Sequence, residues 1–289
     1  MSDTTEQTDD PAQMIAYQGV PGANSHIACL EAFPDMTPQA CETFEDAFAA
    51  VETDSRAALA MIPIENSLGG RVADIHHLLP ESKLYIVKEY YLPVKYQLLA
   101  PEGATLDGLE EVRSHTQALA QCRDQISQLG VRTAARADTA GSAREIAELG
   151  NPKIAAVAPA LAGEIYGLTA LRDRFEDRIG NTTRFVVLSR ARRDPDPHAG
   201  PCVTAMIFQV RSVPAALYKS LGGFATNGVN ISKLESYITG ERFSVARFYA
   251  EIEGHPADLP VAQALEELDY FSSQVRILGA FPADDFRRH

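Results

Sequence analysis

The residues best suited to chemistry lie in four short polar segments, each next to an apolar run. They are rich in amide and hydroxyl side chains, and one of them contains a histidine. Helices that follow strands leave unpaired N–H groups at their first turn, where anions bind. The segments therefore predict a cleft for a small polar ligand. They are 17–22 (YQGVPG), 63–70 (PIENSLGG), 114–122 (SHTQALAQC) and 181–185 (NTTRF).

Each segment taken alone also has an ordinary structural explanation. Gly22 fits a turn, Thr116 fits a helix N-cap, and His115 fits a hydrogen-bonded structural histidine. Asn181 and its neighbours fit a polar turn. Four such segments at strand ends within one domain favour the ligand site over four unrelated turns.

Composition and charge narrow the classes of function. The chain has 289 residues, with 26 basic and 39 acidic side chains and a net charge of -13, which disfavours nucleic acid and anionic membranes as partners. Its four cysteines, Cys29, Cys41, Cys122 and Cys202, show no CxxC spacing, so we expect reduced thiols and no metal or cofactor. Residues 1–13 lack the basic start and apolar stretch of a signal peptide, and no apolar run approaches ~20 residues. We expect a cytoplasmic protein.

An α/β pattern must position the four segments. After a disordered tail over 1–13, residues 14–190 alternate strands with helices, which is typical of parallel sheets. The number of segments favours two α/β lobes with a cleft between them, the second over about 100–175. We expect one helix to start near Asn24 or Ser25, one to be capped by Thr43, and one to be capped by Thr116 and end at Gly130. The expected strands are 14–20, 58–64, 85–99, 111–114, 154–158 and 185–188.

The order of the expected strands and helices changes after a charged, proline-rich linker at 191–202. Residues 203–282 read as a strand, a helix, two strands around the turn Thr239–Gly240, a second helix and a last strand. This βαββαβ order predicts a ferredoxin-like fold. Its open sheet edges are suited to pairing with another copy of the chain.

The four segments, in this order, resemble the signature segments of the prephenate dehydratase family. The segments 213–219 (VPAALYK) and 233–236 (KLES) resemble the phenylalanine-responsive ACT domain that follows it. The resemblance covers about 14–281. It implies a two-lobed catalytic domain like the periplasmic binding proteins, a C-terminal ACT domain, conversion of prephenate to phenylpyruvate, and a homodimer or homotetramer.

The resemblance also implies roles for individual residues. Prephenate loses carbon dioxide and hydroxide as its ring becomes aromatic, which requires donors for the leaving oxygen and for two carboxylates. Thr183 corresponds to the family's key donor. The other catalytic residues implied are Asn66, Ser114, His115 and Gln121, and the substrate-binding residues implied are Glu65, Ser67, Arg184 and Phe185. Thr116 stands where the family usually has proline.

In the ACT segments the resemblance implies a site for L-phenylalanine as effector. The residues implied are Ala215, Ala216, Leu217, Asn230, Ile231, Ser232, Glu235 and Ser236. Two departures bear on it. Ala215 replaces the usual glycine, and its methyl narrows the pocket. Tyr237 and Ile238 replace an Arg-Pro pair.

Two alternatives stay open. An arogenate dehydratase would use the same residues on a substrate that has an ammonium in place of a keto group. A non-catalytic sensor would combine a solute-binding domain with an ACT domain, although the intact Thr183-Arg184-Phe185 argues against it. Turnover of prephenate against arogenate distinguishes all three hypotheses.

Overall fold

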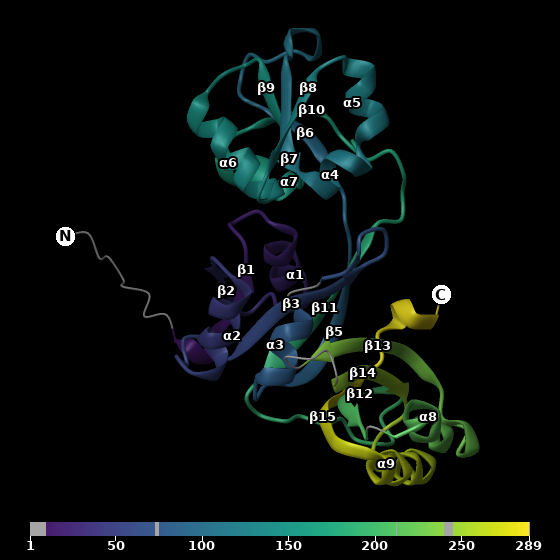
Figure 1. Cartoon of the computed structure of the whole chain (residues 1–289). Helices are drawn as coiled ribbons and strands as arrows, with labels where there is room; N and C mark the ends of the chain where they lie inside the picture. The colour runs from purple at the N-terminus through teal and green to yellow at the C-terminus, as the bar shows by residue number, and fades with distance from the viewer. Residues whose placement is uncertain (1–9, 73–74, 212, 240–244, 289) are drawn as a thin grey trace, which may run out of the picture. The chain divides into compact units, whose positions relative to one another are not determined.

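A computed structural model describes residues 10–72, 75–211, 213–239 and 245–288 (Figure 1). It divides into two compact units. The first contains the chain up to Leu78 together with Tyr90–Phe185, and the second contains Leu79–Glu89 together with the chain from Val186 onward.

The first sheet has the order β2-β1-β3-β11-β5, to which β4 is added beside β3, and the first unit contains all of it except the first part of β5 and the second part of β11. Strand β1 pairs in parallel with both β2 and β3. Its buried sequence MIAYQ is flanked by helices, and Thr43 and Asp46 form a capping box at the start of one of them. The elements are β1 (Met14–Gln18), α1 (Asn24–Ala32), β2 (Thr37–Cys41), α2 (Phe44–Glu52), β3 (Leu59–Asn66), β4 (Gly70–Arg71), α3 (Ile75–Glu81), β5 (Tyr85–Pro93) and β11 (Thr182–Ser189).

A second sheet of order β10-β6-β9-β7-β8 forms the other lobe of this unit. Strand β7 is parallel to β8 and β9, whereas β6 is antiparallel to β9 and β10. Figure 1 shows α6 on one side of β7 and β9 and α5 on the other. The elements are β6 (Gln97–Ala100), β7 (Glu111–His115), α4 (Thr116–Gln121), α5 (Arg123–Leu129), β8 (Arg132–Arg136), α6 (Thr139–Leu149), β9 (Ile154–Ala158), α7 (Ala160–Tyr166) and β10 (Thr169–Arg172).

The second unit contains a four-stranded antiparallel sheet of order β13-β14-β12-β15. Both helices pack on one face of it, around a core that includes Phe208, Phe224 and Leu268. The βαββαβ prediction is therefore confirmed. The elements are β12 (Cys202–Val210), α8 (Ala216–Thr226), β13 (Ile231–Thr239), β14 (Val245–Glu253), α9 (Leu259–Phe271) and β15 (Ser272–Pro282).

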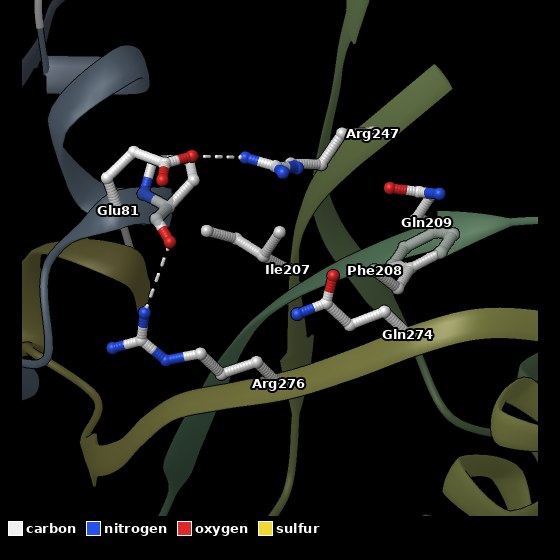
Figure 2. A pocket seen from close by; sticks show the side chains of 8 residues that line it. Glu81, Ile207, Phe208, Gln209, Arg247, Gln274 and Arg276 are labelled. Carbon is white, nitrogen blue, oxygen red and sulfur yellow. Dashed lines mark hydrogen bonds and ion pairs between the residues drawn. The ribbon is translucent and has the colours of Figure 1, made fainter. Parts of the chain in front are cut away.

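The segment 79–89 belongs to this second unit because arginines of the C-terminal sheet hold it. The Arg276 guanidinium donates to the main-chain oxygens of Pro80 at 3.3 Å, Ser82 at 2.5 Å and Leu84 at 3.0 Å. Arg247 forms an ion pair with Glu81 at 2.9 Å. Figure 2 shows both arginines reaching toward this segment across a cavity of about 120 Å³. This segment lies inside the stretch 14–190 that was predicted as the catalytic domain.

Several local predictions were wrong. Helix α1 does start at Asn24, as predicted, but neither Asn24 nor Ser25 caps it, because its N-cap is Ala23 and no side chain caps that helix. The helix predicted to run from Thr116 to Gly130 is two helices that meet at Cys122, and His115 rather than Thr116 caps the first. Pro11–Gln13 form a short 3₁₀ helix, although the tail was predicted as disordered through residue 13. Residues 1–9 and the predicted turn residue Gly240 lie outside the described residues.

The sheets also differ from the parallel arrangement that was expected, because β6 is antiparallel to both of its neighbours. All four cysteines are free and buried, as predicted. Within the described part of the chain, none of the helices has the length and apolar character needed to span a bilayer.

Candidate active site

A cavity of about 580 Å³ opens in the first unit, within the size range of small-molecule sites. It lies at the ends of β1, β3 and β7, at the start of β11, and at the first turns of α1, α4 and α6. Polar ligands bind at such strand ends in α/β folds. The lining residues used below are Gln18, Asn66, Arg71, Val72, Val94, Tyr96, His115, Gln117, Gln121, Asp138, Thr183 and Phe185.

A chain of hydrogen-bonded amides connects the two lobes at this cleft. Asn181 donates through Nδ2 to Gln121 Oε1 at 2.7 Å, and Asn66 Nδ2 donates to Asn181 Oδ1 at 2.7 Å. Asn66 Nδ2 also lies 3.0 Å from Thr183 Oγ1. The geometry thus joins Gln121 of the second lobe to the Thr183 hydroxyl.

The orientation of the Asn66 amide is fixed from its other end. Its Oδ1 accepts hydrogen bonds from the backbone N–H groups of Leu68 at 3.0 Å and Gly69 at 2.7 Å. The amide nitrogen must therefore face Thr183 and donate to its oxygen. Since a hydroxyl has one proton and two lone pairs, Asn66 occupies a lone pair and leaves the Thr183 proton for a ligand. Donation from Asn66 also polarises the hydroxyl and strengthens it as a donor.

His115 and Tyr96 supply further polar atoms. His115 Nδ1 accepts a hydrogen bond from the Gln117 N–H at 3.3 Å, so the neutral ring carries its proton on Nε2 and can donate it. Burial raises the pKa of the Tyr96 phenol well above its ordinary value, although a bond with Asn24 lowers it in part. Tyr96 is therefore neutral near pH 7. Together these residues provide donors for an anionic ligand in a site that is partly shielded from water.

Four residues predicted to act in the site lie outside the cavity lining. Ser114 is fully buried, and its hydroxyl donates to the Val157 carbonyl at 2.6 Å. This bond holds β7 to β9 and gives Ser114 a structural contact, while its catalytic role stays a prediction. Ser67 Oγ donates to the Gly180 carbonyl at 3.2 Å and accepts from the Thr182 N–H at 2.9 Å, which fixes the start of β11.

Arg184 and Glu65 are the other two predicted residues that lie outside the cavity lining, and they bind each other. The Arg184 side chain is only 3% exposed, and its guanidinium binds the Glu65 carboxylate at 3.0 Å. It also lies over the Tyr91 ring, 5.8 Å from the ring centre. Burial next to a carboxylate lets Arg184 support the strand that carries Thr183, and its binding of substrate stays a prediction. Phe185 lines the cleft, and its contact with substrate stays a prediction.

Sequence reasoning missed other residues of the site. Asn181 was seen only as part of a polar segment, yet it is the central link of the amide chain. Asp138 lines the cleft as the N-cap of α6, a helix that was not predicted. Gln18 lies within the first polar segment, at the end of β1, and Arg71 comes directly after the glycine pair of the second segment, and these positions were the available signals.

Gly22, in the first segment, lies where the two lobes approach each other too closely for any side chain. Gly22 has φ +88°, and a Cβ there would lie 2.7 Å from the Ala162 Cα. Next to it, the Tyr166 hydroxyl donates to the Pro21 carbonyl at 2.9 Å. The segment 17–22 therefore fixes one lobe against α7 of the other.

The predicted effector residues lie in the second unit. Ala215 is the N-cap of α8 and has φ +61°, in the left-handed region that favours glycine. Ala216 is buried, and Leu217 and Ile231 pack on the core. On β13, Ser232 donates to the Glu251 carbonyl and Glu235 pairs with Lys233, while Ser236 is exposed. Asn230 donates to Glu253 at 2.8 Å.

Comparisons with known proteins identify the family. Residues 15–193 match the family model described as prephenate dehydratase. A bifunctional N-acyl-homoserine lactone acylase/prephenate dehydratase of Komagataeibacter europaeus is 47% identical over 96% of this chain and 98% of its own length. Arogenate dehydratase/prephenate dehydratase 1 of Arabidopsis thaliana, a chloroplastic protein, is 37% identical over 96% of this chain and 74% of its own length.

A solved prephenate dehydratase from Arthrobacter aurescens, in complex with L-Phe, superposes with a TM-score of 0.86 at 29% identity. The match covers 94% of this chain and 90% of that one. The similarity thus extends through both units. Because the family model matches more than half of the chain, and the cleft presents donors of the kind that this chemistry needs, the chain belongs to the prephenate dehydratase family of carbon–oxygen lyases.

Proposed function

We propose that the cleft converts prephenate to phenylpyruvate, with the Thr183 hydroxyl donating a hydrogen bond to the leaving oxygen. The observation that carries this proposal is the 3.0 Å contact between Asn66 Nδ2 and Thr183 Oγ1, which leaves the threonine proton available. The reaction breaks one C–C bond to release carbon dioxide. Its electron pair moves into the ring, and the ring C–O bond breaks to release hydroxide, which a proton converts to water.

The groups around Thr183 are suited to that charge movement. Negative charge develops on the leaving oxygen, and donors already in place there lower the barrier because they need no reorganisation. A threonine hydroxyl is too weak an acid to transfer its proton outright, so we assign it hydrogen bonding and not full proton transfer. His115 Nε2–H and the amide side chains of the cleft are the donors proposed for the substrate carboxylates.

The purified chain should convert prephenate to phenylpyruvate without added metal or nucleotide, because the proposed chemistry uses only these donors. The measurement is phenylpyruvate formation before and after treatment with a chelator. We expect the two rates to agree. Activity that the chelator abolishes and a divalent metal restores would make this mechanism wrong.

We further propose a homodimer or homotetramer in the cytoplasm, inhibited by L-phenylalanine at the turn before α8. The L-Phe complex of the Arthrobacter aurescens relative supports the choice of effector. The first turn of α8 offers N–H groups to a carboxylate. Inhibition then requires that the effector bind one arrangement of the units more tightly than another.

Ala215→Gly should bind L-phenylalanine more tightly than the wild type, because the substitution removes a methyl group and relieves a left-handed backbone at the N-cap. The same relief should raise the free energy of unfolding by roughly 0.5–1 kcal/mol. Calorimetric titration and thermal unfolding measure the two effects. Ala216→Gly is the matched control and should destabilise the protein, because residue 216 is helical. No binding at millimolar effector by either protein would show that the altered segments have lost the site.

Hydrolysis of N-acyl-homoserine lactones is a second candidate activity. It is suggested by the name of the 47% identical relative, and the cleft offers Val72, Val94 and Phe185 as an apolar surface for an acyl chain. Water would be consumed as the amide C–N bond breaks. Release of homoserine lactone by the purified chain tests it, and no release under conditions of full prephenate turnover would exclude it.

A further inference from the structure

The charge of the cleft is concentrated in very few side chains. Among its described lining residues, Arg71 is the one permanent cation and Asp138 the one carboxylate. A substrate with two carboxylates approaches a protein whose net charge is -13. Its attraction to the site therefore depends on local cations, because the overall field of the protein repels it.

Arg71 is held in place by the hairpin that carries Asn66. Strand β4 pairs with β3 so that Arg71 stands opposite Glu65, and Gly70 stands opposite Asn66. Hydrogen bonds from Leu68 and Gly69 to Asn66 Oδ1 close the turn between the two strands. One small hairpin thus presents both the guanidinium and the amide that binds Thr183.

The carboxylate opposite Arg71 on β3 and the carboxylate of the described cavity lining are already engaged. Glu65 binds the guanidinium of Arg184 at 3.0 Å. Asp138 accepts the Gly141 N–H at 2.5 Å, and its position as N-cap ties it to α6. Within the part of the chain that the structure describes, Arg71 has no ion-pair partner. As far as the described residues go, its fork of N–H donors can therefore bind a carboxylate ligand.

From these observations we infer that Arg71 binds a carboxylate of the substrate and makes the cleft prefer prephenate to arogenate. The inference rests on the proposed function. The two substrates differ by a keto group against an ammonium, so arogenate has one more positive charge. A guanidinium in the cleft attracts the dianion more strongly. Among the described lining residues, the carboxylate that could attract the ammonium of arogenate is Asp138, which already caps α6.

The test compares steady-state kinetics on both substrates for the wild type, Arg71→Gln and Arg71→Lys. We expect Arg71→Gln to raise the KM for prephenate about tenfold, with a smaller change in kcat, because a charge-assisted contact is lost from the bound state. The kcat/KM for arogenate should change much less, so the preference of the enzyme for prephenate over arogenate becomes smaller. The KM of Arg71→Lys for prephenate should lie between those of the wild type and Arg71→Gln, because lysine keeps the positive charge but lacks the forked N–H donors of arginine.

Arg56→Gln is the matched control, because it removes the same charge from an exposed side chain ahead of the start of β3. It should leave both KM values unchanged. An unchanged prephenate KM in Arg71→Gln, or an equal loss on both substrates, overturns the inference.

Direct binding separates this inference from the proposed function. Thr183→Val protein with and without Arg71→Gln is titrated calorimetrically with prephenate, and the second substitution should weaken binding about tenfold. If the wild type fails to convert prephenate but the titration shows this loss, the proposed function fails and Arg71 remains a carboxylate-binding residue. Equal affinities in the titration contradict the role of Arg71 whatever the turnover.

Discussion

Thr183→Val should reduce kcat for prephenate by roughly 10²–10³-fold, the usual effect of losing one donor to a developing oxyanion. The hydroxyl is the group that Asn66 orients at 3.0 Å, and valine keeps the shape of the side chain while removing its proton. Binding of prephenate should change much less than kcat, because the contact strengthens as the C–O bond breaks. Steady-state kinetics and calorimetric titration measure the two quantities.

Thr183→Ser is the matched control for this prediction. It keeps the hydroxyl and should retain most of the activity. Unfolding curves of both variants should resemble that of the wild type, because residue 183 lies at the cleft and not in the core. Near-normal turnover by the valine variant would show that Thr183 only supports the fold.

The second large effect concerns stability. In Gly279→Ala, the added Cβ would lie 2.0 Å from the Ile86 carbonyl oxygen and 3.0 Å from its carbonyl carbon, and the backbone has φ +157°. Both obstacles are main-chain features, so no side chain can move aside to relieve them. We expect β15 to separate from the segment 79–89, with a loss of about 3 kcal/mol or more in the free energy of unfolding.

Gly222→Ala makes the same chemical change in the same unit and should raise the free energy of unfolding instead of lowering it. Gly222 lies inside α8, and a Cβ there meets nothing within 4 Å. Alanine should stabilise that helix by up to about 1 kcal/mol. Urea unfolding of both variants is the measurement, and similar stability changes in the two would refute the close approach of Gly279 to Ile86.

The parts of the fold that could be predicted were those with strong local signals. The buried strand 154–158, the helix cap at Thr43 and the βαββαβ order of the C-terminal unit all follow from apolar runs and caps. The strands β2 and β8 were not predicted because each is an edge strand of its sheet, where the sequence pattern is weaker. One contains Pro38, and the other, RTAAR, is polar and mostly exposed.

The site was predictable as a set of segments but not as a set of contacts. Asn66 and Thr183 are 117 residues apart in sequence, and only the folded sheet shows that they are hydrogen-bonded. The motif pattern could not separate side chains that face the cleft from those that support it. Ser114 and Arg184 are examples, because each is buried and bonded within the protein, which the motif pattern could not show.

The attachment of 79–89 to the C-terminal unit had no sequence signal at all. Arg276 provides it through main-chain oxygens, whose direction no side-chain pattern reveals. The same limit applies to Ala215, whose left-handed backbone is visible only in the structure. Contacts made by the backbone are the features that sequence reasoning is least able to predict.

The most direct test of the proposed site is a crystal structure of Thr183→Val protein with prephenate bound. The substitution should slow turnover enough for the substrate to be trapped. We expect prephenate in the cleft, with its ring hydroxyl facing residue 183 and the Asn66 amide, and one carboxylate within hydrogen-bonding distance of Arg71. Prephenate bound elsewhere, or bound in the cleft with its ring hydroxyl turned away from residue 183, would contradict the central claim.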